Sequence, residues 1–214
     1  MDDTGRVLVI ACGALAREIT ALKRLNGWAA VDVSCLPPEL HNRPERIPGS
    51  VATAIREARA SYRQIFVAYA DCGTGGALDR VLAAEQVERL PGAHCYEFFA
   101  TSAVFSDLHD AEPGTFYLTD FLVRHYERLV RVGLGMDRHP ELAGEYFRNY
   151  RRVVYLVQAP DADLKRRAAD IAASLGLAYE ERQTGYGELA TTLVDVVRRA
   201  GATVVIEAPR PTTG

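Results

Sequence analysis

The sequence predicts an α/β protein in which mostly parallel β-strands carry helices on both faces. Two observations predict this fold class. Short runs of β-branched and aromatic residues alternate with longer stretches whose apolar residues recur every three or four positions. The run at 7–11 is apolar throughout, as expected of a strand that is covered on both faces of a parallel sheet. The alternation of the two patterns is typical of repeated strand–helix units.

The first half of the chain contains three such units. Strands are predicted at 7–11, 30–35 and 64–70, and helices at 14–25, 50–60 and 76–84. The helix at 14–25 is well defined, because its leucine and isoleucine residues fall on one side. Beyond the turn at Pro91 and Gly92, we expect a short strand at 93–96 and a helical stretch from Glu97.

The second half of the chain repeats the alternation of strands and helices. Strands are predicted at 115–118, 153–158, 178–182 and 202–207, and helices at 120–132, 140–150, 162–175 and 186–200. Pro140 is compatible with the first position of its helix. No serine- or glycine-rich linker separates the halves, so we expect a single α/β domain over 1–214, formed by two fused Rossmann-like lobes at 1–110 and 111–210.

Composition excludes several classes of protein. The formal net charge is −3, and acidic and basic residues are interspersed, so no basic face for nucleic acid or anionic lipid is expected. No apolar run is long enough for a membrane span, and the acidic start MDDTGR does not resemble a signal peptide. We therefore expect a cytoplasmic protein with a small-molecule substrate and no nucleic-acid or membrane partner.

Three cysteines lie where predicted strands end. Cys12 and Cys72 each precede glycine at such an end, and Cys95 follows the turn at Gly92. The carboxyl ends of parallel strands meet at one edge of a sheet, where helix N-termini and backbone amides favour an ionised thiol. We therefore expect these three thiols to form a metal site, with His94 as a further ligand. The alternative is that each is a small buried apolar residue. Cys35 ends a strand without a following glycine and is left out.

Three cysteines with one open position are compatible with two cofactors. One is zinc, Zn(II), and the other is a [4Fe–4S] cluster with one iron free for substrate. Either would act as a Lewis acid, and only the cluster adds electron transfer. Ligands that come from three distant strand ends favour the cluster over zinc.

Other residues are candidates for the same edge of the sheet. Glu97 is a candidate general base if the chain around it is extended, and His41 is a candidate ligand or acid–base group in a proline-rich loop. The substrate-binding candidates are the glycine-rich turn and the start of the last predicted helix: Gly73, Thr74, Gly75, Gly76, Tyr186 and Glu188. The turn and the helix start also have ordinary structural explanations, as a tight βα turn and a capped helix.

Six segments form a set that extends over most of the chain. They are Cys12-Gly13, Leu40 to Pro44, Tyr69 to Gly76, His94 to Glu97, Phe116 to Asp120 and Thr184 to Glu188. Together they resemble the bacterial and archaeal family of unknown function numbered 1638. The resemblance implies no established activity. It does imply a setting near genes for corrinoid-dependent methyl transfer from methylamines, and so a link to one-carbon or small-amine metabolism.

The leading hypothesis is a cytosolic metalloprotein, an enzyme of small-molecule metabolism (one-carbon, methylamine or sulfur), with its metal at the carboxyl edge of the sheet. The first alternative is a non-catalytic protein that binds a small molecule or corrinoid and assists a corrinoid methyltransferase system. The second is nucleophilic catalysis by the Cys72 thiol at a helix start, which predicts selective alkylation of that residue.

Overall fold

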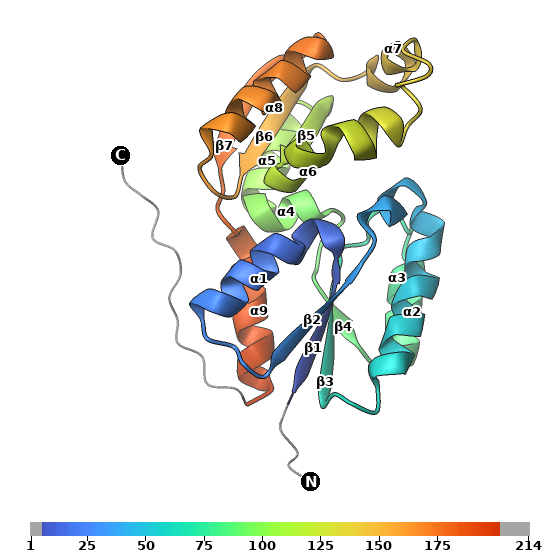
Figure 1. The fold of residues 1–214 in the computed structure, drawn as a ribbon, viewed down its shortest axis with the longest axis vertical. Helices are drawn as coiled ribbons and strands as arrows, with labels where there is room; N and C mark the ends of the chain where they lie inside the picture. The colour runs from blue at the N-terminus through green and yellow to red at the C-terminus, as the bar shows by residue number, and fades with distance from the viewer. Residues whose placement is uncertain (1–5, 202–214) are drawn as a thin grey trace. The chain divides into compact units, whose positions relative to one another are not determined.

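The structure, a computed structural model, describes residues 6–201, and the chain divides into two compact units (Figure 1). Unit 2 runs from Tyr96 to Gly187, and unit 1 contains the chain on either side of it. Unit 2 is therefore inserted into the sequence of unit 1. The sequence placed the boundary between the lobes near residue 110, whereas the chain leaves unit 1 after Cys95 and returns at Glu188. The strand predicted at 202–207 lies outside the described residues.

Unit 1 is built on a parallel sheet with the strand order β2-β1-β3-β4. The strands are β1 (Val7–Cys12), β2 (Val31–Leu36), β3 (Gln64–Ala68) and β4 (Glu88–Arg89). Every residue of β1 is buried, which explains why its sequence is apolar throughout. The first three strands confirm the prediction. The two residues of β4 are too few for a periodic pattern, and their strand was not predicted.

Helices cover both faces of this sheet, as predicted. Figure 1 shows α1 (Ala16–Leu25) and α9 (Gly187–Arg199) on one face, and α2 (Ile47–Ala58) and α3 (Ala77–Glu85) on the other. Three short 3-10 helices occupy loops: η1 (Gly13–Leu15), η2 (Pro38–Asn42) and η3 (Pro44–Arg46). The apolar side of each long helix faces the sheet, so the core of unit 1 is a buried layer between two helix layers.

The strand predicted at 93–96 is wrong. The helix α4 (Cys95–Ala100) begins there instead. Its Phe98, Phe99 and Ala100 are all buried. The helical stretch predicted from Glu97 is present, but it begins at Cys95.

Unit 2 contains a second parallel sheet with the order β5-β6-β7. Its strands are β5 (Thr115–Thr119), β6 (Arg152–Val157) and β7 (Ala178–Gln183). Its remaining helices are α5 (Ser102–Ala111), α6 (Asp120–Tyr126), the π-helix η4 (Glu127–Val132), α7 (Leu142–Phe147) and α8 (Ala162–Ser174). Alternate residues of β6 enter opposite cores. Val153 and Tyr155 pack with α6 and α8, whereas Val154 and Leu156 pack with Ala100 and Leu108.

A buried carboxylate joins β5 and β6 at their carboxyl ends. Asp120 accepts hydrogen bonds from the Tyr155 hydroxyl at 2.8 Å, from the Gln158 amide at 3.1 Å and from the Ala159 amide at 3.0 Å. The Gln158 side chain in turn accepts a bond from the Asp120 amide at 2.7 Å. Asp120 is therefore part of the structural framework of unit 2, as its position at a helix start indicated.

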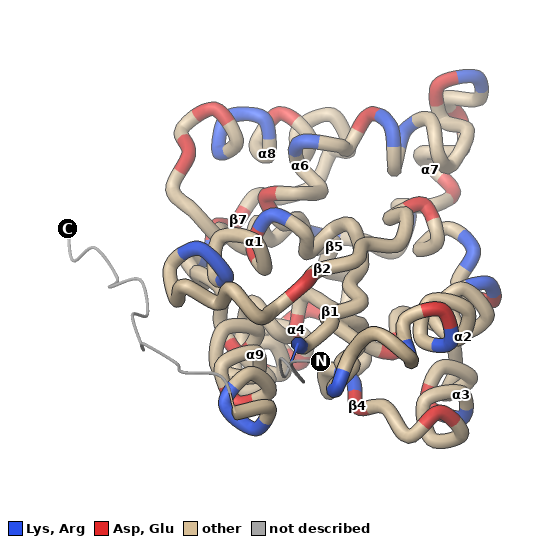
Figure 2. The backbone as a smooth tube through the Cα atoms, turned by 60° about the horizontal axis from the view of Figure 1, so that its bottom comes forward, with Lys and Arg blue, Asp and Glu red and all other residues tan. Residues whose placement is uncertain are grey.

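Charged residues of both signs occur along the same helices. Figure 2 shows basic and acidic positions close together on α2, α3 and α8. Charges of opposite sign that lie close together on these helices partly cancel each other's field. Within residues 6–201, none of the helices combines the length and the apolar character that crossing a membrane requires.

Candidate metal centre

The carboxyl edge of the unit 1 sheet brings together one histidine and three cysteines. Cys12 ends β1, His41 follows β2, Cys72 follows β3 and Cys95 follows β4. Each strand of the sheet thus contributes one of these residues. The strand order reverses between β1 and β3, and such a reversal is where open parallel sheets bind their ligands.

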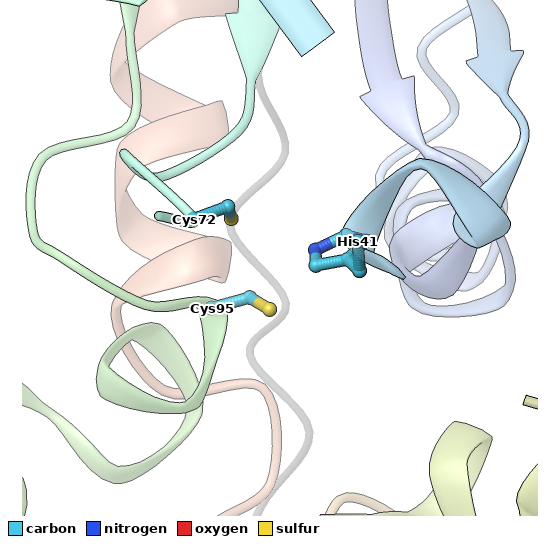
Figure 3. A group of neighbouring side chains, drawn as sticks. All are labelled: His41, Cys72 and Cys95. Atoms are coloured by element: carbon cyan, nitrogen blue, oxygen red, sulfur yellow. The ribbon is translucent and has the colours of Figure 1, made fainter. Parts of the chain in front are cut away.

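Three of these side chains converge closely. The ligand atoms of His41, Cys72 and Cys95 all lie within 4.8 Å of one another. Figure 3 shows Cys72 and Cys95 on one side and His41 on the other, with the imidazole ring directed toward the two thiols. All three residues are partly buried. Partial burial reduces competition from solvent while leaving access for a small molecule.

The loop that carries His41 is fixed by contacts with two glycines. A methyl group added to Gly13 would lie 2.9 Å from Pro38 Cδ, so the chain after β1 touches the start of η2. A methyl group added to Gly73 would lie 3.6 Å from Pro44 Cβ. Proline restricts the backbone on both sides of His41. The proline-rich loop therefore holds the imidazole against the ends of β1 and β3.

The loop that carries Cys72 is organised by the carboxylate of Asp71. This carboxylate accepts hydrogen bonds from the Thr74 hydroxyl at 2.6 Å, the Gly76 amide at 2.9 Å and the Gly75 amide at 3.1 Å. The Thr74 bond contributes most to lowering the pKa of Asp71. Cys72 itself has φ 50°, in the left-handed region that non-glycine residues rarely adopt. Strained backbone of this kind is concentrated at functional sites.

Backbone hydrogen bonds place Cys95 beside Cys72. The amides of Asp71 and Cys72 donate to the carbonyls of Gly92 and Ala93, at 3.2 and 2.9 Å. Arg89 braces the same loop, because its guanidinium donates to the carbonyls of Leu90 and Gly92 while pairing with Asp79. These contacts continue the pairing of β3 with β4 beyond the strands.

The two nitrogen atoms of His41 have different surroundings. Nδ1 lies 3.1 Å from the carbonyl oxygen of Pro38, which can only accept a hydrogen bond. That contact favours the proton on Nδ1 and leaves the lone pair of the neutral ring on Nε2. Nε2 is buried, with no hydrogen-bond partner in the described structure. Metal-binding histidines commonly donate their other nitrogen to a carbonyl in this way.

Cys12 lies on the Nδ1 side of the imidazole. Its Sγ is 3.7 Å from His41 Nδ1 and accepts a hydrogen bond from the Ala14 amide at 3.3 Å. Cys12 is almost fully buried, and it is not a member of the three-residue group. The structure therefore places this predicted ligand next to His41, on the edge of the ring that faces Pro38.

The thiols and the imidazole perturb one another. Burial by itself lowers the pKa of His41, but its contacts with the thiols of Cys12 and Cys72 outweigh burial and raise it to about 11. The hydrogen bond to Cys95, followed by burial, raises the pKa of Cys72. We had expected the strand end to favour the ionised thiol, and this expectation is wrong for Cys72. In the metal-free protein, the His41 imidazole and the Cys72 thiol therefore keep their protons. A metal ion that binds these groups would displace the protons.

The other predicted site residues lie in different surroundings. His94 is exposed and lies outside the three-residue group. Glu97 lies in the helix α4, so the extended chain that would direct it alongside Cys95 is absent. Within the predicted glycine-rich cradle Gly73–Gly76, the amides of Gly75 and Gly76 donate to Asp71. Tyr186 directly precedes α9, and Glu188 lies in its first turn.

Sequence reasoning gave His41 a secondary place and assigned no role to Tyr69. The signal for His41 was present, because it follows a parallel strand as Cys72 does. Proline residues after that strand obscured it. Tyr69 directly follows β3 and is almost fully buried. The centre of its ring lies 6.3 Å from that of His41, at an interplanar angle of 13°.

Comparison with known proteins identifies a family. No curated protein and no solved structure matches the chain. A family model described as "Protein of unknown function (DUF1638)" matches residues 35–193. The matched segment includes His41, Cys72 and Cys95 and begins after Cys12. The chain thus belongs to the DUF1638 family, as the six segments indicated.

Proposed function

We propose that this protein is a metalloenzyme that binds one zinc ion through His41, Cys72 and Cys95 and offers the fourth coordination position to a small-molecule substrate. The observation that carries the proposal is the convergence of three ligand atoms within 4.8 Å, one of them from a histidine whose buried Nε2 has no hydrogen-bond partner in the described structure. A bound metal would give that nitrogen its partner.

The geometry favours a single ion over a cluster. Two thiolates on tetrahedral zinc, with bonds of about 2.3 Å, lie roughly 3.8 Å apart. Side chains whose ligand atoms lie within 4.8 Å reach that arrangement with small shifts. An iron–sulfur cluster contains several iron and sulfide atoms, so its protein ligands lie farther apart than those of a single ion. Such clusters are held mainly by cysteine. One histidine and two cysteines form a ligand set of catalytic zinc sites.

The charges are also compatible with zinc. Two thiolates neutralise a divalent cation, and the neutral imidazole adds a third ligand without charge. Zinc would supply a Lewis acid to the substrate at the open position. The protein's own contribution is to hold three ligands on loops that Asp71, Arg89 and Pro44 fix in place. A reducing cytoplasm, which we propose as the location, would keep the thiols free to bind.

Metal analysis of protein purified without oxygen tests the proposal. We expect one zinc per chain and no visible absorption. The substitutions Cys72→Ser and Cys95→Ser should each remove the metal, whereas Cys35→Ser should keep it, because Cys35 is exposed and outside the three-residue group. A brown protein with iron and sulfide would favour the cluster. Protein without stoichiometric metal would contradict both.

A second candidate function is thiol chemistry without metal. The contact of 3.7 Å between Cys12 Sγ and His41 Nδ1 is the observation that favours it. Two features weigh against it: Cys12 is almost fully buried, and the raised pKa of Cys72 keeps that thiol protonated. Iodoacetamide distinguishes the two functions. Zinc binding predicts that Cys12 and Cys72 of the protein as purified resist alkylation, whereas thiol catalysis predicts rapid alkylation of one of them.

A further inference from the structure

Two thiols of the candidate metal centre contact each other directly. The sulfur atoms of Cys72 and Cys95 lie within 4.8 Å of one another, and their hydrogen bond is the main cause of the raised pKa of Cys72. The sulfur–sulfur bond of a disulfide is about 2.05 Å long, so the two sulfur atoms need to approach by less than about 3 Å. Rotation of the two side chains supplies a movement of this size.

The backbone holds the two cysteine-bearing segments side by side. The amides of Asp71 and Cys72 donate to the carbonyls of Gly92 and Ala93, at 3.2 and 2.9 Å. Cysteines on segments that are far apart or that diverge cannot be bridged without movement of the backbone. Here the segments are already hydrogen-bonded to each other next to both cysteines. A bond between the two sulfur atoms therefore requires little rearrangement of the chain.

The other two cysteines do not belong to this pair. Cys12 is almost fully buried and lies on the Nδ1 side of His41, outside the three-residue group. Cys35 is exposed and also lies outside that group. Cys72 and Cys95 are both partly buried, which leaves a small oxidant access to their sulfur atoms. Proximity and access thus favour one pairing among the cysteines of the chain.

We infer that Cys72 and Cys95 are a redox-sensitive modification site, at which a peroxide converts the two thiols into a reversible disulfide. One sulfur attacks a peroxide oxygen, the O–O bond breaks, and a sulfenic acid and one water molecule form. The second sulfur then attacks the first, the S–O bond breaks, and a second water molecule leaves. Two thiols and one hydrogen peroxide thus give one disulfide and two water molecules. The peroxide gains the two electrons that the sulfur atoms lose, and the thiol protons end in the water.

The consequence of this oxidation rests on the proposed metal site. The thiolate is the form of cysteine that binds metal, so a disulfide removes two of the three proposed ligands and leaves His41 alone. Zinc affinity should then fall by more than about 100-fold, and reduction with dithiothreitol should restore it. The disulfide itself needs only the two thiols, so we expect it in the metal-free protein as well.

Peptide mapping tests the inference, because each cysteine lies in a different tryptic peptide: 7–17, 25–46, 64–80 or 90–124. Wild-type protein, both as purified and after a chelator has removed metal, is treated with one equivalent of hydrogen peroxide and digested without reduction. We expect a disulfide between peptides 64–80 and 90–124 that dithiothreitol reverses. Protein that contains zinc should release it to a coloured chelator as the disulfide forms.

Cys35→Ser is the matched control. It removes an exposed sulfur from outside the three-residue group, so it should form the same disulfide as the wild type. Cys72→Ser and Cys95→Ser should each form no disulfide under the same conditions. Equal thermal unfolding of the metal-free proteins checks that the three variants fold.

The outcomes separate this inference from the metal site. Disulfides that include Cys12 or Cys35, or a wild type in which Cys72 and Cys95 stay reduced, would overturn the inference. Conversion of either residue to a sulfinic acid, which adds two oxygen atoms and is not reversed by dithiothreitol, would overturn it too. Protein that forms the expected disulfide but contains no zinc, or keeps its zinc, would contradict the proposed metal site and leave the redox-sensitive pair standing.

Discussion

His41 has the two properties that a metal-binding histidine requires. Its Nδ1 is directed at a backbone carbonyl, and its Nε2 is buried beside two thiols without a hydrogen-bond partner in the described structure. The sulfur of Cys12 contacts the ring on the Nδ1 side, but Cys12 does not belong to the three-residue group of His41, Cys72 and Cys95. At the scale of the residue, the carbonyl of Pro38 in the proline-rich loop favours the tautomer with its proton on Nδ1. This tautomer leaves the Nε2 lone pair for the proposed metal.

The substitution His41→Ala should reduce zinc affinity by at least about 100-fold, because it removes one of three ligands. Competition with a coloured zinc chelator measures the change. His94→Ala is the matched control, since it removes an exposed imidazole next to Cys95 from outside the group. Equal losses in the two variants would show that His41 is not a ligand.

At the scale of the element, the turn from Asp71 to Gly76 after β3 is held in one conformation by its own hydrogen bonds. The Asp71 carboxylate occupies the glycine-rich turn that the sequence marked as a candidate for substrate binding, because it accepts from the amides of Gly75 and Gly76. Internal capping fixes the backbone that carries Cys72 in its left-handed conformation. The turn therefore positions a thiol before any ligand binds.

Asp71→Ala should lower the free energy of unfolding by about 1–2 kcal/mol at neutral pH, allowing for solvent screening of a partly exposed carboxylate. The folded pKa of Asp71 is lowered from its ordinary value of 3.8, so its contribution is present above that value and is lost as the pH falls through the folded pKa. Urea unfolding at neutral and acid pH measures both effects.

The difference between wild type and Asp71→Ala should therefore shrink in acid. Glu57→Ala, which removes an exposed carboxylate from α2, should leave stability nearly unchanged at either pH. A pH-independent difference between wild type and Asp71→Ala would instead assign the effect to packing.

Much of this fold could be predicted from the sequence, because strands and helices longer than one turn leave a periodic signal. Cys72 was placed at this edge for that reason, whereas Cys95 was placed there by a predicted strand at 93–96 that the structure replaces with the start of α4. Their meeting with His41 depends on contacts between loops, such as Pro38 against Gly13, which no spacing in the sequence encodes. The position of β4 depends on two residues, Glu88 and Arg89, too few for a pattern.

At the scale of the whole molecule, unit 2 is an insertion in the sequence of unit 1, and the chain returns to unit 1 only after the last residue of unit 2. Cys95 is the last residue of unit 1 before the insertion, and α9 returns to unit 1 from Glu188. The proposed ligands all precede the insertion. The buried Asp120 network lies wholly within unit 2. The proposed metal ligands and the Asp120 network thus belong to different units.

Asp120→Ala should destabilise unit 2 by about 3 kcal/mol, since it leaves the buried Tyr155 hydroxyl and the backbone amides of Gln158 and Ala159 without this acceptor. Zinc affinity should be unchanged, because the ligands belong to unit 1. Hydrogen exchange followed by mass spectrometry locates the loss of protection, which we expect in peptides from 96–187. Asp170→Ala, at an exposed position of α8, is the control.

Loss of zinc binding in Asp120→Ala at a temperature where unit 1 peptides remain protected would contradict this separation. Loss of protection in both units at once would show that the chain unfolds as a single cooperative body.

The two ends of unit 2 lie side by side. A methyl group added to Gly187 would lie 2.1 Å from the carbonyl oxygen of Phe98 and 2.5 Å from that of Phe99, so the outgoing chain presses against the incoming one. An insert whose two ends are adjacent can be removed, lengthened or exchanged without changing the chain on either side of it, so unit 1 would keep its sulfur and imidazole donors.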